Sequence, residues 1–107
     1  MKLFRNIDEK LESIGFVKVS ENEYGANFER VNKKYNYTQC VDILHKVSGA
    51  HIIQSYDKAL MDEENIGNTC VGLTYFELKL FMRKMKQIGL DSNMLLVPYI
   101  NISRENR

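Results

Sequence analysis

The fold is decided by the stretch LTYFELKLFMRKMKQIGL, residues 73–90. Thr74 and Glu77 have the spacing of a capping box, in which each side chain binds a free backbone N–H of the first helical turn. Gly89 stands where a left-handed residue commonly ends a helix. Apolar residues recur between these ends at intervals of three and four: Leu78, Phe81, Met82, Met85 and Ile88. The stretch therefore predicts one amphipathic helix that covers another layer.

The residues before this helix alternate with the period of β-strands. Strands are predicted at residues 16–19, 23–31, 35–46 and 51–56, with a fifth at 69–72. One face carries the apolar side chains and also Gln39 and His45: Tyr24, Ala26, Phe28, Tyr35, Tyr37, Val41 and Ile43. The other face is polar and consists of Asn27, Glu29, Asn36, Thr38, Cys40 and Asp42. Antiparallel strands of this kind need a cover on one face alone.

A second amphipathic helix is predicted at residues 2–14, ahead of the strands, and Gly15 ends it. Its apolar stripe is Leu3, Phe4, Ile7, Leu11 and Ile14. Two such helices suffice to cover one face of the sheet. The predicted fold is therefore a two-layer α+β domain, an antiparallel meander of four to five strands with N-terminal and C-terminal amphipathic helices on one face.

Length and composition set further bounds. A chain of 107 residues predicts a single domain spanning 1–107. Residues 94–102 are apolar, and because Pro98 cannot donate a ladder hydrogen bond, the tail 91–107 is predicted to hold an edge strand or a covering segment. No apolar run is long enough to span a bilayer, and acidic residues stand where a signal peptide needs an apolar core. Cys40 and Cys70 lack motif spacing, so a cytoplasmic protein is expected.

The order of these features resembles a group of small uncharacterised α+β proteins from phages and prophages of Gram-positive bacteria. The matching pieces are Ser13-Ile14-Gly15-Phe16, the strands from Tyr24 to Tyr56, and the helix that opens with Thr74 and Glu77-Leu78-Lys79. The resemblance covers about residues 2–90. It implies a mobile-element origin and a small accessory role, and it carries no catalytic residues, cofactor or established partner.

The residues able to do chemistry do not form a catalytic or metal-binding pattern. His45 and His51 flank the Ser48-Gly49 turn; a two-residue turn points them to opposite faces, and a longer turn of odd length places them on one face. Even then two ligands fall short of the three or four that a metal site usually needs. Cys40 and His45 differ in strand parity, so they form no nucleophile–base pair. We expect a non-enzymatic protein without metal or cofactor.

Protein binding is the remaining large class, and we expect it to use an acidic loop together with the polar sheet face. The loop residues are Asp57, Asp62, Glu63 and Glu64. The partner would be a host or phage protein, such as a nuclease or a defence factor that the chain inhibits. The loop lacks the alternating ligands of a calcium site, so a solvated or partner-binding loop is the interpretation.

Two alternatives stay open. The first is nucleic-acid binding through a basic hairpin and one helix face: Arg30, Lys33, Lys34, Lys79, Arg83 and Lys86. Cations with interleaved aromatic rings bind single strands, but the net charge of +1 lacks the basic excess typical of such domains. The second alternative is a self-associating structural protein, a homodimer joined through the tail 94–102. No membrane partner is expected.

Overall fold

The computed structural model of the chain describes residues 7–61 and 69–92. Its strands form one antiparallel sheet in which each strand pairs with its neighbours in sequence, in the order β1-β2-β3-β4. The strands are β1 (Val17–Asn22), β2 (Gly25–Asn32), β3 (Tyr37–Leu44) and β4 (Ile52–Asp57). The predicted segment 69–72 contributes a single bridge between Cys70 and Tyr56 rather than a strand. The predicted antiparallel meander is therefore confirmed, with four strands in the described ranges.

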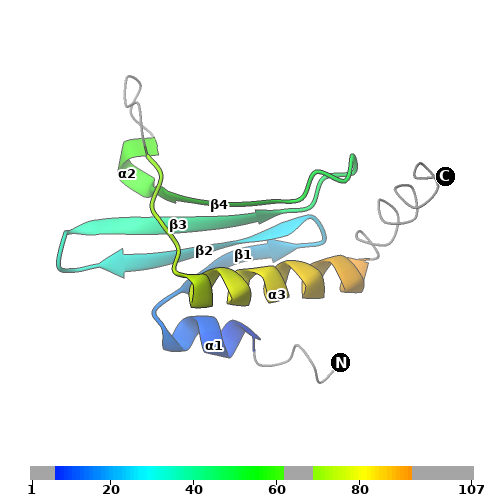
Figure 1. Ribbon diagram of the computed structural model, residues 1–107, viewed down its shortest axis with the longest axis horizontal. Coiled ribbons are helices and arrows are strands. Elements are labelled where there is room, and N and C mark those ends of the chain that lie inside the picture. The colour runs from blue at the N-terminus through cyan, green and yellow to red at the C-terminus, as the bar shows by residue number, and fades with distance from the viewer. Residues whose placement is uncertain (1–6, 62–68, 93–107) are drawn as a thin grey trace.

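The helices are α1 (Ile7–Ser13), the short α2 (Lys58–Met61) and α3 (Tyr75–Ser92). Figure 1 shows α1 and α3 side by side on one side of the sheet, with α2 at the far end of β4. This arrangement confirms the two-layer α+β fold with helices at both ends of the domain. We call the sheet face toward α1 and α3 the inner face, and the opposite one the outer face. None of the helices in the described ranges combines the length and apolar character needed to cross a membrane.

The core lies between the inner face and the two long helices. Its largest buried members come from every layer: Ile7, Leu11, Phe16, Phe28, Val41, Ile43, Leu80, Phe81 and Ile88. Phe81 is the centre of an aromatic cluster, because its ring lies edge-on to Phe16 at 4.9 Å and to Phe28 at 5.5 Å between centroids. Such edge-to-face pairs stabilise a core beyond the area they bury. The contact holds α3 against both the sheet and the segment after α1.

The start of α3 is built as predicted. The Thr74 N–H donates to Glu77 at 2.9 Å, and the Glu77 N–H donates to the Thr74 hydroxyl at 3.1 Å, which completes the capping box. The predicted end is wrong, because the helix continues through Gly89 to Ser92. A glycine permits a left-handed cap but does not impose one, and its cost inside a helix is about 1 kcal/mol.

One sequence assignment near a turn also changes, because the predicted strand 16–19 leaves residues 20–22 to a turn. Strand β1 runs through Asn22, so residues 20–22 are strand rather than turn, and the chain reverses after an Asn22 side chain that accepts the Tyr24 N–H at 2.8 Å. The register slips between Lys18 and Ser20, which marks a β-bulge in this edge strand. The apolar stripe 2–14 is described from Ile7 onward; Leu3 and Phe4 lie outside the described residues, as does the tail 93–107.

Candidate interaction surfaces

The side of α3 that points away from the sheet carries an unusual mixture of aromatic, apolar and basic residues. We call it the α3 outer face, and it consists of Tyr75, Phe76, Lys79, Met82, Arg83, Lys86 and Leu90. Four of its members are large apolar side chains with high exposure: Tyr75 77%, Phe76 60%, Met82 55% and Leu90 41%. At 3.6 residues per turn these positions fall within roughly one third of the helix circumference. They therefore form one continuous stripe.

The spacing predicts Met82 in the buried stripe of the helix, and this prediction is wrong, because Met82 is exposed. The residue that fills the core in its place is Leu80, which is 3% exposed. Both positions satisfy a spacing of three or four with some of their neighbours, so periodicity alone does not separate them. The signal for the α3 outer face was nevertheless present in the sequence, since Tyr75, Phe76 and Leu90 fall opposite Phe81 and Ile88.

The charged residues of α3 divide between the same two sides. Lys84 points inward and is 2% exposed, and its ammonium lies 2.8 Å from Asp8 of α1 and 2.7 Å from Glu21 of β1. Lys79, Arg83 and Lys86 remain on the α3 outer face with no ion pair to any residue in the described ranges. Lys79 instead lies over the Tyr75 ring, 5.2 Å from its centroid. Three cations are thus available for an external partner.

The buried Lys84 belongs to a cluster of four charges that ties α1, β1 and α3 together. Lys18 completes it, because its ammonium lies 2.9 Å from both Asp8 and Glu21. Burial raises the pKa of Asp8 and that of Glu21, but hydrogen bonds from Lys84 and Lys18 outweigh it and hold both below their usual range. Since all four charges are matched within the fold, this cluster is structural.

Arg30, one of the residues expected on the nucleic-acid surface, makes its contacts within the fold. Its guanidinium donates to Glu77 at 2.7 Å and to Gln39 at 2.9 Å, and it stacks 4.1 Å above the Phe16 ring. Burial raises the pKa of Glu77, but the Thr74 N–H and the Arg30 guanidinium outweigh it and lower that pKa overall. Arg30 therefore fastens the end of β2 to the start of α3.

The tip of the β2–β3 hairpin keeps its other predicted cations. Lys33 and Lys34 are exposed, and Lys34 lies over the Tyr35 ring at 5.3 Å from the centroid. Tyr35 had been assigned to the buried face, yet it is 67% exposed, because residues 33–36 form the turn and β3 begins at Tyr37. Asn36 makes this turn possible with a φ of 55°, a conformation that asparagine tolerates. The tip is thus a small basic patch with one free ring.

The outer face of the sheet carries most of the predicted polar residues, and Asn27, Glu29, Cys40 and Asp42 have hydrogen-bond or ion-pair partners there, whereas Asn36 lies in the β2–β3 turn. Asp42 accepts hydrogen bonds from the Asn27 amide and from the Tyr56 hydroxyl. Burial and the neighbouring Asp42 raise the pKa of Tyr56 well above its usual range. Lys58 of α2 pairs with Glu29 at 3.0 Å. Because these groups already satisfy each other, the outer face offers a partner few unpaired polar groups.

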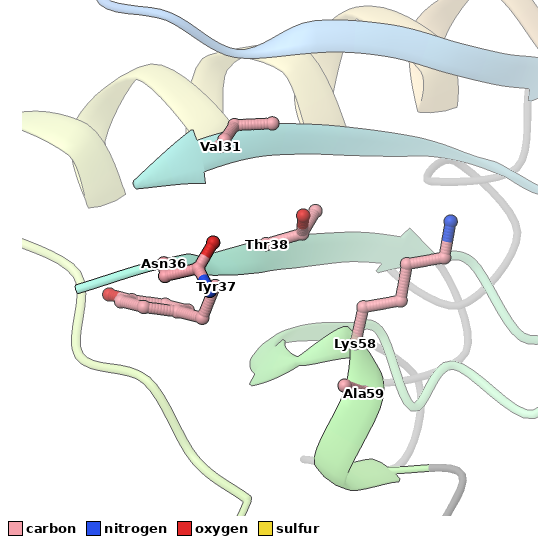
Figure 2. A pocket seen from close by; sticks show the side chains of 6 residues that line it. All are labelled: Val31, Asn36, Tyr37, Thr38, Lys58 and Ala59. Carbon is pink, nitrogen blue, oxygen red and sulfur yellow. The ribbon is translucent and has the colours of Figure 1, made fainter. Parts of the chain in front are cut away.

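A shallow pocket of about 390 Å³ opens where α2 meets the end of this face. Figure 2 shows Val31 of β2 and Thr38 of β3 on one side and Lys58 and Ala59 of α2 on the other. Asn36 and Tyr37 complete the lining. Among the described residues, the lining includes no carboxylate, imidazole or thiol, and Lys58 pairs with Glu29.

The acidic surface is described only at its first residue. The Asp57 carboxylate accepts the N–H groups of Ala59 at 3.0 Å and Leu60 at 3.2 Å, so it caps the short helix α2. Asp62, Glu63 and Glu64 lie outside the described residues. Of the four expected partner-binding residues, Asp57 thus has a structural role at the helix start.

Among the described residues, the structure brings together only some of the catalytic and metal-binding candidates. Cys40 is on the outer face and His45 on the inner side, as strand parity predicts. His45 and His51 do meet, because the connection between Leu44 and Ile52 has an odd number of residues. Within the described ranges, no group of three or more His, Cys, Asp or Glu side chains is placed to hold a metal ion.

Comparison of the chain with protein-family models, with curated proteins and with solved structures finds no match. The resemblance to phage proteins therefore stays a prediction, and the function has to be argued from the surfaces themselves.

Proposed function

We propose that this protein is a non-enzymatic binding module that docks a partner protein on the α3 outer face. The observation that carries the proposal is the exposure of Tyr75, Phe76, Met82 and Leu90 on one stripe. Single exposed apolar residues are normal on a protein surface, but a contiguous group is typical of an interaction site. Tyrosine, phenylalanine, methionine and arginine are also the residue types enriched in protein–protein interfaces.

The α3 outer face is held on a rigid base. Its helix is capped at Thr74, fastened to β2 through Glu77 and Arg30, and packed against the sheet through Phe81. The backbone of such a support loses little freedom on binding, so less of the interaction free energy is spent on ordering the helix. Lys79, Arg83 and Lys86 lie among the apolar side chains without an acidic residue on the described part of this face. The complementary surface of the partner is therefore expected to be acidic.

Nucleic-acid binding is the second candidate, favoured by the exposed Tyr35 ring beside Lys34 at the hairpin tip. Three observations favour protein binding over nucleic-acid binding. Arg30 and Lys84 form ion pairs within the fold. The net charge is only +1, and Met82 and Leu90 of the α3 outer face have no ring on which a base could stack. Self-association through the same stripe is a third outcome, since a second copy also meets an exposed apolar surface.

The test compares matched double variants in capture from native host lysate, with and without nuclease. F76S/M82S alters the α3 outer face, and K33S/K34S alters the hairpin tip as the control. Any captured protein is identified, purified and titrated by calorimetry. We expect F76S/M82S to weaken its affinity on the order of 30-fold, the effect of losing one interface hot spot, and K33S/K34S to leave it unchanged.

Three results would overturn the proposal. Equal affinity of F76S/M82S and the unaltered protein would remove the α3 outer face as the docking site. Capture that disappears with nuclease and with K33S/K34S would establish the nucleic-acid alternative. A dimer in sedimentation that F76S/M82S dissolves would establish self-association. A further variant, D62N/E63N/E64N, tests the acidic loop, and retained capture by it excludes that loop.

A further inference from the structure

Two imidazoles close the end of the β3–β4 hairpin. Leu44 and Ile52 are the last pair in the ladder, so His45 and His51 occupy the next opposed positions. Their Nδ1 atoms are 3.0 Å apart, and the rings meet nearly edge-to-face with centroids at 4.7 Å. The Nε2 atom of His45 lies 2.7 Å from the carbonyl oxygen of Met85, in the middle of α3. His45 is 3% exposed, so this chain of contacts crosses the protein interior.

The carbonyl at one end fixes the proton positions along this chain. A carbonyl only accepts, so His45 must carry its proton on Nε2 and donate it to Met85. The Nδ1 atom of neutral His45 then has no proton and can only accept a hydrogen bond through its lone pair. The proton in the 3.0 Å contact must therefore belong to His51 Nδ1, which donates it to His45. Neutral His51 therefore has a lone pair on Nε2. That atom is buried and has no hydrogen-bond partner among the described residues.

In this geometry, a second proton on either ring has a free-energy cost. A proton on His45 Nδ1 would face the N–H of His51 across the same short contact, so that hydrogen bond would break. A proton on His51 Nε2 would create a charged N–H at a buried position without an acceptor. The contact between the two rings is therefore favoured when both are neutral, and it becomes less favourable as the pH falls.

The surrounding charges do not compensate for this. Lys84 of α3 is neutralised by Asp8 and Glu21, whereas Lys46 on the connection and Lys86 on α3 are exposed to solvent. From the turn between β1 and β2, the contact is the Tyr24 carbonyl, which accepts the His45 backbone N–H at 2.6 Å. Burial lowers the pKa of His45; the hydrogen bond to Met85 opposes this effect, and repulsion from His51 adds to it. No carboxylate among the described residues contributes to this balance.

We propose that His45 and His51 form a proton-controlled latch that fastens the β3–β4 connection, residues 45–51, to the middle of α3. Both rings are neutral in the closed latch. A proton taken from solvent either breaks the Nδ1–Nδ1 hydrogen bond or places a charged N–H at the buried Nε2 of His51. Both costs are relieved when the rings separate and the connection opens to solvent. α3 itself stays docked, because Phe81, Ile88 and the Arg30–Glu77 ion pair hold it independently. The opening is local and leaves the fold in place.

The test is a pH titration of the full chain labelled with nitrogen-15, observed through the imidazole nitrogens and the backbone amides. At pH about 7.5 we expect the proton of His45 on Nε2 and that of His51 on Nδ1. The titration midpoint of His45 is expected below 6.5, its ordinary value. The amides of residues 46–50 should shift with the same midpoint, and their hydrogen exchange should become roughly fivefold faster once the bond is lost.

Two variants isolate the pair. H51F keeps a ring of similar size but removes the donor and the second charge, so the midpoint of His45 should rise and the amides of residues 46–50 should follow it. K46Q changes a charge on the same connection and should change neither tautomer nor midpoint. Three results would each overturn the latch. They are a proton on His45 Nδ1 at neutral pH, an unchanged His45 midpoint in H51F, and backbone amides of residues 46–50 whose shifts do not follow the imidazole midpoints. No readout involves a binding partner, so the latch stands or falls apart from the proposed function.

Discussion

The two sides of α3 contain the same residue types in opposite situations. Phe81 is fully buried between Phe16 and Phe28, whereas Phe76 on the same helix is 60% exposed. Lys84 is 2% exposed and ion-paired, whereas Lys86 is exposed on the α3 outer face. The difference shows that residue type does not decide whether a side chain holds the fold or remains available to a partner. The position of each residue relative to the sheet decides it.

The largest expected effect separates the two phenylalanines. Phe81→Ala should lower the free energy of unfolding by about 3–5 kcal/mol, because it removes a buried ring and leaves a cavity beside two others. Phe76→Ala should change it by less than about 0.5 kcal/mol, as is usual for surface substitutions. Urea unfolding followed by circular dichroism measures both. If Phe76→Ala lowered the free energy of unfolding as much as Phe81→Ala, the α3 outer face would have to be covered within the fold.

The next effect separates the two lysines. Lys84→Met keeps the volume of the side chain but leaves Asp8 and Glu21 with Lys18 as their one remaining cation in the cluster. Removing one member of a buried ion pair is strongly destabilising, and partial exposure of the two carboxylates reduces the loss to about 2 kcal/mol. Lys86→Met should be close to neutral in the same denaturation experiment. Equal stability of the two variants would contradict the inward role of Lys84.

The pH dependence sharpens the same comparison. Asp8 and Glu21 have lowered pKa values in the folded state, so their contribution to stability is full above their ordinary values of 3.8 and 4.5 and is lost as the pH falls through the lower folded values. The pKa of His45 is lowered too, so stability should begin to fall once the pH drops below 6.5. The melting temperature measured between pH 8 and 3 should decline in two steps, one below pH 6.5 and one at acidic pH. Lys84→Met should reduce the decline at acidic pH and leave the decline below pH 6.5 unchanged.

The smallest effect concerns the start of the helix that both sides share. Thr74→Ala removes the hydroxyl that accepts the Glu77 N–H and should cost about 1 kcal/mol. Thr74→Ser keeps the hydroxyl and serves as the control, with stability close to that of the unaltered chain in urea unfolding. If Thr74→Ser destabilised the protein as much as Thr74→Ala, the methyl group of Thr74, rather than its capping hydroxyl, would be the source of the stability.

The sequence predicted the elements that depend on local pattern. The capping box at Thr74, the four strands and the burial of Phe28, Val41, Phe81 and Ile88 all follow from spacings of two, three or four residues. Such spacings act within one turn or one strand, so a single chain is enough to read them.

The features that sequence pattern missed depend on partners far apart in the chain. Arg30 pairs with Glu77 across a separation of 47 residues, and Lys84 of α3 reaches Asp8 of α1. Nothing near either cation distinguishes it from a solvent-exposed neighbour. The choice between Leu80 and Met82 likewise depends on the angle at which α3 meets the sheet, which periodicity leaves undetermined.

The order of the strands has a consequence for how the chain acquires its structure. Each strand pairs with the one before it, so the sheet can grow hairpin by hairpin from contacts that are close in sequence. α3 follows the sheet in the chain, and it supplies Leu80, Phe81 and Ile88 to the core. During synthesis on the ribosome, Phe28, Val41 and Ile43 therefore emerge before the helix that covers them. The nascent sheet is exposed to aggregation during that interval, and the interval ends when α3 leaves the exit tunnel.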